Sequence, residues 1–125
     1  MFRCLENNKS NNEGTQGGSC PVDTGKIAAE MLPNEEMLYE LADLFKMFAD
    51  STRIKILYAL MEKEMCVACI ADAVGVSQSA VSHQLRLLKQ ARLVRFRREG
   101  KQVLYALSDN HVHSMLAQGM NHICE

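Results

Sequence analysis

Residues 66–89 read CVACIADAVGVSQSAVSHQLRLLK, and this stretch decides the fold because it predicts two helices joined by a tight turn. Ala71, Gly75 and Val81 have the spacing of a helix-turn-helix, which needs a small residue, a turn with positive φ and a packed apolar residue at those places. Apolar side chains recur on the inner faces of both helices: Val67, Ile70, Ala71, Val74, Val81, Leu85 and Leu88.

The outer face of the second helix carries short or polar side chains, which are able to reach base edges and phosphates in a major groove. This face consists of Ser77, Gln78, Ser79, Ser82, His83 and Arg86, and Ser77 is also placed to cap the helix. We expect this face to bind DNA.

The residues that follow predict a β-hairpin. Residues 93–98 and 101–107 are two β-like runs, and Glu99-Gly100 between them predicts a tight turn. A hairpin placed directly after a recognition helix is the wing of a winged helix. The expected fold class is therefore mainly α (α+β), a winged helix-turn-helix. Residues 108–125 are expected to add a C-terminal dimerisation helix and so to make the protein dimeric.

Positive charge gathers in this region, although the chain as a whole has a net charge of −1. Seven of the fourteen Lys and Arg residues lie between positions 86 and 101, where only Glu99 opposes them: Arg86, Lys89, Arg92, Arg95, Arg97, Arg98 and Lys101. Such a cluster attracts a phosphate backbone, so we expect DNA contacts from the wing residues Arg95, Arg97, Arg98 and Lys101. The alternative is a solvated basic face on an ordinary hairpin.

Length and composition fit one small globular domain with an extension, since the chain has 125 residues, 47% hydrophobic and 23% charged. Residues 1–33 are mostly polar and predict a flexible arm, and residues 34–125 predict the folded domain that contains the helix-turn-helix and the wing. No apolar run is long enough for a membrane helix or a secretory signal, so we expect a cytoplasmic protein without a membrane partner. The five cysteines are then expected to be reduced thiols or metal ligands.

The start of the domain predicts two further helices. Asn34 is placed to cap the first, and Ala49-Asp50-Ser51-Thr52 breaks and recaps the chain before the second. The first helix carries an apolar stripe that we interpret as core: Met37, Leu38, Leu41, Leu44, Phe45 and Phe48.

The C-terminal residues 108–125 predict a helix of about four turns that Ser108 or Asp109 caps. His111, Met115, Gln118, His122 and Glu125 share one stripe of this helix, beside an apolar stripe of Val112, Leu116, Gly119 and Ile123.

The two histidines of this stripe cannot bind one metal ion within a single helix. They lie roughly 16 Å apart along the axis, whereas zinc takes its nitrogen and oxygen ligands at about 2 Å. Two antiparallel helices of a symmetric dimer bring His111 of one chain to His122 of the other, with Asp109 and Glu125 nearby to complete two equivalent sites. The alternative is a surface helix whose histidines contact only water.

A second candidate site is rich in thiols. Cys66 and Cys69 are three residues apart and can face one metal ion, and Cys4 and Cys20 on the arm could fold over to ligate it as well. The alternatives are two small apolar cysteines in a core helix and two unremarkable thiols on the arm.

Several segments together resemble the ArsR/SmtB family of winged-helix metal-sensing repressors. These are residues 48–57 (FADSTRIKIL), residues 77–85 (SQSAVSHQL), Gly100-Lys101 with Tyr105, Asp109-x-His111 and His122-x-x-Glu125. The resemblance covers residues from about 35 to 125. It implies a homodimer that binds double-stranded operator DNA, represses a metal-efflux or resistance operon, and leaves the DNA when metal binds.

The resemblance also implies ligands. Zinc-sensing members have an intersubunit site at the positions of Asp109, His111, His122 and Glu125, and other members have a thiolate site at the position of Cys66, often with cysteines from the N-terminal arm. This chain departs from that thiolate pattern, since it reads Glu64-Met65-Cys66-Val67-Ala68-Cys69 where Cys-x-Cys or Cys followed by Asp is common. Zn(II) is the expected metal, with Cd(II), Pb(II) or Co(II) as other candidates.

Two rival functions remain. A thiol-based redox or arsenite sensor on the same fold would use Cys66 and Cys69. A thiol–disulfide exchange enzyme would use the same Cys-x-x-Cys motif, but such motifs normally open a helix after a strand in an α/β setting, and the sequence predicts no preceding strand. We therefore expect a regulator rather than an enzyme.

Overall fold

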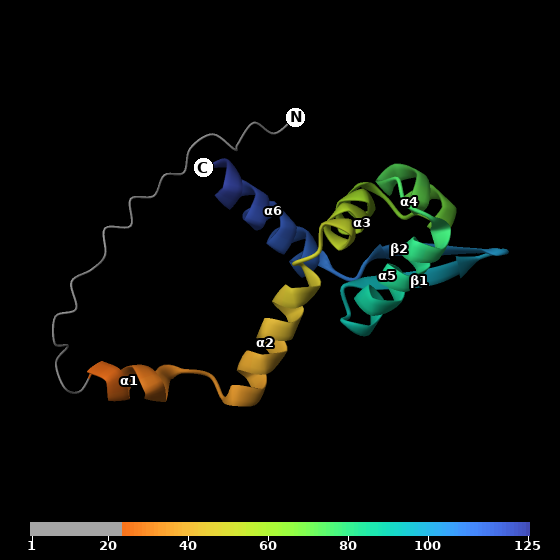
Figure 1. Ribbon diagram of the computed structural model, residues 1–125. Coiled ribbons are helices and arrows are strands. Elements are labelled where there is room, and N and C mark those ends of the chain that lie inside the picture. The colour runs from red at the N-terminus through yellow and green to blue at the C-terminus, as the bar shows by residue number, and fades with distance from the viewer. Residues whose placement is uncertain (1–23) are drawn as a thin grey trace.

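The computed structural model describes residues 24–125 (Figure 1). The elements are, in order, α1 (Thr24–Met31), α2 (Glu35–Met47), α3 (Ser51–Glu62), α4 (Val67–Val74), α5 (Gln78–Gln90), β1 (Val94–Glu99), β2 (Gln102–Leu107) and α6 (Asn110–Cys124). The expected fold class is confirmed: α3, α4 and α5 lie together, the β1–β2 hairpin extends beside them as the wing, and α6 follows (Figure 1).

Polar caps and one glycine set the boundaries of the central helices, as the sequence predicts. The Asn34 Oδ1 atom accepts the backbone N–H of Met37 at 2.9 Å, and the Asp50 carboxylate accepts that of Arg53 at 3.0 Å. Ser77 caps α5 through the N–H of Ala80 at 3.1 Å. Gly75 ends α4 in the left-handed region with φ +80°, a conformation that glycine adopts without a Cβ penalty.

The hydrophobic core lies between α3, α4, α5, the start of β1 and the first half of α6. Its buried members are Ile56, Leu57, Leu60, Ile70, Ala71, Val81, Leu85, Leu88, Leu93, Val94, Val112 and Leu116. The predicted inner faces of the helix-turn-helix are therefore confirmed, because Ala71 and Val81 are buried on either side of Gly75. The Tyr58 hydroxyl donates to the Leu116 carbonyl at 3.3 Å and fastens α6 to α3.

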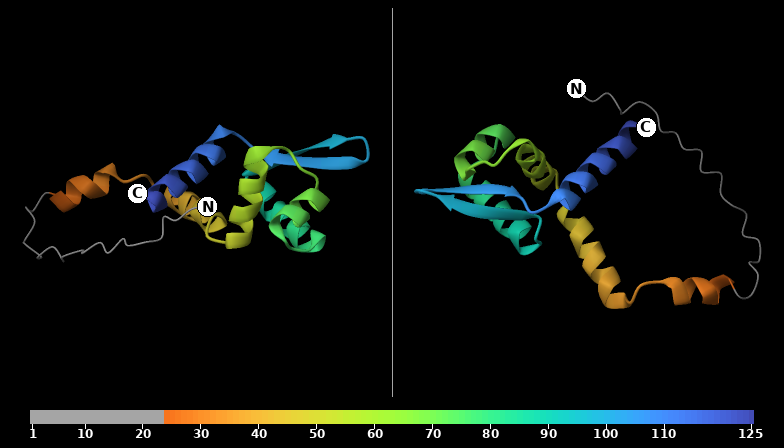
Figure 2. Two further views of the ribbon diagram at one scale, coloured as in Figure 1. Left: turned by 90° about the horizontal axis from the view of Figure 1, so that it is seen from above. Right: turned by 180° about the vertical axis from the view of Figure 1, so that it is seen from behind.

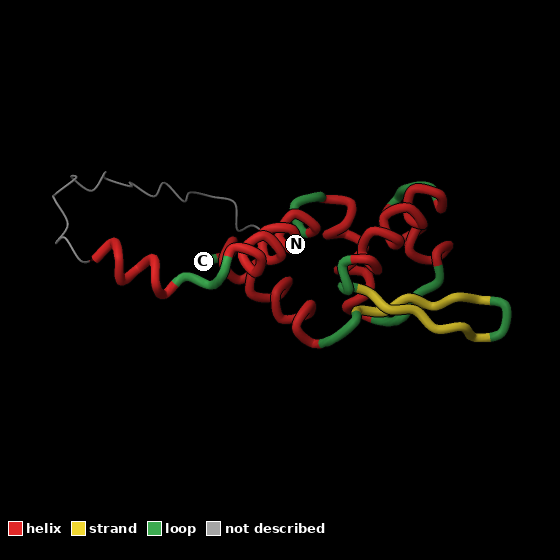
Figure 3. The backbone as a smooth tube through the Cα atoms, turned by 90° about the horizontal axis from the view of Figure 1, so that it is seen from below, coloured by secondary structure: helices red, strands yellow, loops and turns green. Residues whose placement is uncertain are grey.

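The wing is an antiparallel hairpin in which Glu99 pairs with Gln102, so its two-residue loop is Gly100-Lys101 (Figure 3). The predicted Glu99-Gly100 turn was wrong by one residue, because Gly100, at φ +61°, takes the first position inside the loop and leaves Glu99 in the strand. Met65 forms an isolated antiparallel bridge with Tyr105, with N···O distances of 2.8 and 3.1 Å. The loop before α4 is thus joined to β2.

The interpretation of the α2 stripe as core is only partly correct for a single chain. Leu44 and Phe48 are partly buried and pack against the core, but the rest of the stripe does not. No residue of α2 is buried, and Met37, Leu41 and Phe45 are exposed. The helix runs away from the winged-helix body, as α6 does (Figures 1 and 2). An apolar groove lies between α2, α3 and α6, lined by Phe45, Phe48, Ile54, Tyr58, Met115, Leu116, Gly119, Met120 and Ile123. Periodicity identified an apolar face but not what covers it.

Part of the predicted flexible arm is helical, since α1 occupies residues 24–31 of the segment 1–33. The exposed side chains of Met31 and Leu32 follow it. Cys4 and Cys20 lie outside the described residues. The division of the chain at residue 33 stays a prediction.

Candidate nucleic-acid interface and metal-ligand positions

The predicted DNA-reading face of α5 is on the surface. The side chains of Ser77, Gln78, Ser79, Ser82, His83 and Arg86 are all exposed, while the opposite face of the helix is in the core. The Ser77 hydroxyl already accepts the Ala80 N–H, and it lies 3.3 Å from the Ser79 hydroxyl. Ser77 therefore has a structural role as the helix cap, whatever it contributes to DNA.

The wing arginines do not share one face. Successive residues of a strand point to opposite sides, so Arg95 and Arg97 lie on one face of β1, while Phe96 and Arg98 lie on the other. The ammonium group of Lys89 on α5 lies 3.9 Å from the centre of the Phe96 ring, a cation–π contact that identifies the second face as the one toward α5. Arg98 therefore shares the recognition-helix side of the wing.

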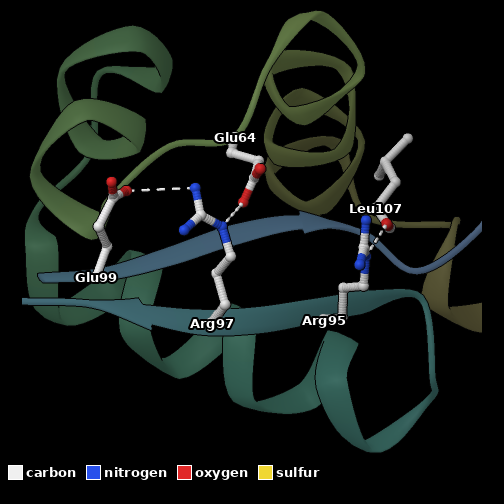
Figure 4. Close-up of polar contacts among 5 residues, drawn as sticks. All are labelled: Glu64, Arg95, Arg97, Glu99 and Leu107. Atoms are coloured by element: carbon white, nitrogen blue, oxygen red, sulfur yellow. Dashed lines mark hydrogen bonds and ion pairs between the residues drawn. The ribbon is translucent and has the colours of Figure 1, made fainter.

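Arg97 is bound by two carboxylates. Its Nε atom lies 2.8 Å from Glu64 Oε2, in the loop before α4, and its Nη2 atom lies 3.3 Å from Glu99 Oε2 (Figure 4). The hydrogen bond and charge of Glu64 raise the pKa of the Arg97 guanidinium. Arg95 donates from Nε to the Leu107 carbonyl at 3.3 Å. Glu99 is the only acidic residue within positions 86–101, as the sequence shows, but the fold adds a second carboxylate from Glu64, which is 33 positions before Arg97.

Two of the four predicted C-terminal metal ligands, Asp109 and His111, lie at the start of α6. Asp109 Oδ1 caps the helix by accepting the N–H groups of His111 at 2.9 Å and Val112 at 3.2 Å, while Oδ2 lies 3.5 Å from His111 Nδ1. These bonds, that of Val112 first, lower the pKa of the Asp109 carboxyl. The His111 side chain is 91% exposed, so the imidazole is accessible to a further group.

The other two candidates are at the far end of the same helix. His122 is exposed in the last turn of α6, and Glu125 follows as its C-cap residue. Within the described part of the chain, no three His, Cys, Asp or Glu side chains gather closely enough to hold a metal ion. The intersubunit set therefore stays a prediction, and it would need a second chain.

Cys66 and Cys69 are brought together at the start of α4. Their Sγ atoms lie 3.3 Å apart, and Cys66 caps the helix by accepting the Cys69 N–H at 3.5 Å. That backbone N–H, together with the Cys69 thiol, lowers the pKa of Cys66, while the neighbouring Cys66 sulfur raises the pKa of Cys69. A helix N-terminus favours a thiolate, so Cys66 is the thiol of the pair that loses its proton more readily.

These elements define the class of protein, which is a winged helix-turn-helix DNA-binding fold. Outside its core, α2 and the second half of α6 carry exposed apolar side chains. Residues 50–95 match the model of the family described as bacterial regulatory protein, arsR family. The chain is 40% identical to a cadmium resistance transcriptional regulatory protein CadC homolog of Staphylococcus aureus, over 66% of this chain and 69% of that protein. The chain therefore belongs to the ArsR family, and the resemblance stated from the sequence is confirmed.

Two further comparisons agree. The chain is 44% identical to the transcriptional repressor SmtB homolog of Synechocystis, over 69% of this chain and 65% of that protein. A homodimeric winged helix-turn-helix DNA-binding domain from Mycobacterium bovis, a possible ArsR-family transcriptional regulator, covers 83% of this chain and 86% of its own at 29% identity, with a TM-score of 0.63. These relatives are regulators, which confirms the expectation that the chain is not an enzyme. Among residues 24–125, no helix is long and apolar enough to cross a membrane.

Proposed function

We propose that this protein is a metal-responsive transcriptional repressor that binds operator DNA as a homodimer and leaves it on binding Zn(II), or the related Cd(II), Pb(II) or Co(II), thereby controlling metal efflux or resistance genes in the cytoplasm. One observation carries the metal part of the proposal. The helix α6 has a carboxylate and an imidazole at its start, Asp109 and His111, and another such pair at its end, His122 and Glu125.

DNA binding would use two copies of the α5 face. In a symmetric dimer the two recognition helices enter successive major grooves, and an inverted repeat with half-sites about one helical turn apart matches that symmetry. The exposed Gln78, Ser79, Ser82, His83 and Arg86 are the base and phosphate contacts that we propose from α5, with Ser77 holding the start of the helix. Lys101 and Arg98 lie at the exposed tip of the wing.

The C-terminal donors suit zinc or cobalt chemically. Asp109 keeps Oδ2 outside its capping bonds, and His111 is almost fully exposed, so one oxygen and one nitrogen ligand are available at this end of α6. We propose that His122 and Glu125 of the second chain would complete a four-ligand set. Bound there, the metal would join the two α6 helices through a rigid bridge.

The attachment of α6 supports a route from this site to DNA. The Tyr58–Leu116 hydrogen bond ties α6 to α3, and the Ser108 hydroxyl donates to the Arg92 carbonyl, just after α5, at 2.7 Å. A change in the angle between two α6 helices would therefore move both recognition helices. The coupling required is of the usual allosteric size, about 1–3 kcal/mol.

A DNA-binding titration tests the proposal. The metal-free protein would first be used to select operator duplexes from a random-sequence pool. The affinity of the protein for the selected duplex would then be measured by gel shift with and without Zn(II). We expect zinc to weaken binding at least about tenfold, corresponding to about 1.4 kcal/mol, and His122→Ala to remove the response while keeping metal-free affinity. Unchanged affinity in the presence of zinc would reject the metal response.

The alternative proposal is a thiol-based redox or arsenite sensor. The 3.3 Å separation of the Cys66 and Cys69 sulfur atoms and the lowered pKa of Cys66 favour it. Cd(II) and Pb(II) also prefer thiolates, and Cys4 and Cys20 would be their additional ligands in that case. Cys66→Ser, compared with His122→Ala and with a double Cys4→Ser, Cys20→Ser variant, separates the sites: the variant that abolishes release from DNA identifies the input.

A further inference from the structure

The basic cluster of the wing contains residues with different surroundings. Arg98 and Lys101 lie exposed at the tip, and Arg98 is on the face toward α5. Arg97 is on the other face and is bound to Glu64 and Glu99. An arginine that already meets two carboxylates would have to give up those bonds before it could neutralise a phosphate.

The partner Glu64 belongs to a segment that the wing already pairs with. Met65, its neighbour, exchanges two backbone hydrogen bonds with Tyr105 of β2. The Glu64–Arg97 bond connects the same loop to β1, on the adjacent strand (Figure 4). The loop before α4 therefore holds both strands of the hairpin, one through the main chain and one through side chains.

The opposite face of the wing is held separately. Lys89 of α5 lies over the Phe96 ring, and the Phe96 and Tyr105 rings are 6.0 Å apart. The hairpin is thus fixed from the α5 side by a cation–π contact and from the loop side by an ion pair. A two-stranded hairpin is only marginally stable alone in water, so its direction depends on such contacts.

From these contacts we propose that Arg97 is a positioning residue, which Glu64 binds to hold the wing against the loop at residues 63–66, and that Arg98 is the arginine of β1 that contacts the DNA phosphates. The inference rests on the proposed DNA binding for the role of Arg98. The role of Arg97 is independent of it.

The first measurement is hydrogen exchange of the Met65 and Tyr105 amides in the full chain, because these two N–H groups report the pairing between loop and wing. We expect Arg97→Gln and Glu64→Gln each to speed their exchange about two- to fivefold, the range for a partly exposed ion pair. The double variant should be no faster than either single one. Glu62→Gln, which changes an exposed carboxylate two positions earlier, is the matched control and should leave both rates unchanged.

The second measurement is the salt dependence of binding to a short random-sequence duplex, which counts phosphate contacts without a known operator. Arg98→Gln should lower the slope of log K against log salt by about 0.9 per chain, and Arg97→Gln should leave it unchanged. If Arg97→Gln does not fold, Arg97→Lys replaces it. Lysine keeps the positive charge but lacks the planar guanidinium, whose N–H groups bind two carboxylates at once.

Each result has a defined meaning. Faster exchange with an unchanged slope for Arg97→Gln supports the positioning role. A slope reduced as much as in Arg98→Gln overturns it, as do unchanged exchange rates. Failure of the wild-type chain to bind the duplex rejects the proposed DNA binding instead, and the exchange rates still decide what Arg97 does.

Discussion

Gly75 allows the helix-turn-helix to turn, because its φ of +80° is strained for any residue with a Cβ atom. A Cβ placed there would meet no heavy atom within 4 Å, so the cost of a substitution is conformational rather than steric. We expect Gly75→Ala to lower the free energy of unfolding by about 1–2 kcal/mol, measured by urea denaturation. Gly75→Asn should cost less, since asparagine enters the left-handed region more readily. Equal losses for the two variants would contradict this account.

Asp109 has a lowered pKa because its carboxylate accepts backbone N–H groups at the start of α6, that of Val112 first. The folded-state pKa is below the unfolded value of about 3.9. Its contribution to stability is therefore complete above the unfolded pKa and is lost as the pH falls through the folded one.

The matched variant is Asp109→Asn, which caps a helix without titrating. In metal-free protein, we expect the stability of the wild type relative to this variant to be constant near neutral pH and to fall on acidification below about pH 4. Thermal unfolding across this range measures the difference. A difference that does not change with pH would show that the capping bond is not made by the ionised carboxylate.

At the scale of elements, α5 combines a structural cap with the proposed DNA face at a single residue. Ser77→Ala removes the bond to the Ala80 N–H and should cost about 1 kcal/mol of stability. Ser77→Asp keeps a cap but places negative charge on the DNA side, so we expect near wild-type stability with weaker duplex binding. Thermal unfolding and fluorescence anisotropy separate the two effects. Unchanged stability in Ser77→Ala would show that the side chain does not act as a cap.

The helices α3 and α5 are also joined by side chains. Arg53 donates from Nε to Gln84 Oε1 at 2.8 Å, in a partly buried position. A hydrogen bond to a charged group contributes about 1.5–3 kcal/mol, so Arg53→Met and Gln84→Met should each destabilise the protein. In a double-mutant cycle by urea denaturation we expect a coupling of about 1.5–3 kcal/mol. The pair Arg53→Met and Ser82→Ala is the control and should be additive.

At the scale of the whole molecule, the exposed apolar faces of α2 and α6 border one groove, which is consistent with the homodimeric domain that the chain resembles. We expect Phe45→Glu, at a side chain 56% exposed in one chain, to shift the protein from dimer to monomer at micromolar concentration, because it would place a charge in an apolar interface. Analytical ultracentrifugation measures this. Glu36→Gln, on the opposite side of α2, is the control. A dimer that persists in Phe45→Glu would place the interface elsewhere.

The local sequence pattern was sufficient to predict the helix-turn-helix, its helix caps and the presence of the hairpin. Asn34 and Ser77 each accept a backbone N–H from the residue three positions later. Gly75 permits the turn through its own positive φ. Val81 and Leu85 lie on one face of α5 because of the helical periodicity. These interactions depend on neighbours in the chain, so the sequence alone determined them. It also determined that His111 and His122 lie too far apart on one helix to share a metal ion.

Only the tertiary structure decided which faces are covered and which charges are paired. The apolar stripe of α2 has the periodicity of a core helix, but within one chain only its C-terminal end, at Leu44 and Phe48, packs against the core. Met37, Leu41 and Phe45 of the same stripe stay exposed. Glu64 and Arg97 meet across 33 positions because Met65 pairs with Tyr105. Contacts between distant residues depend on how whole elements pack, and sequence spacing does not contain that information.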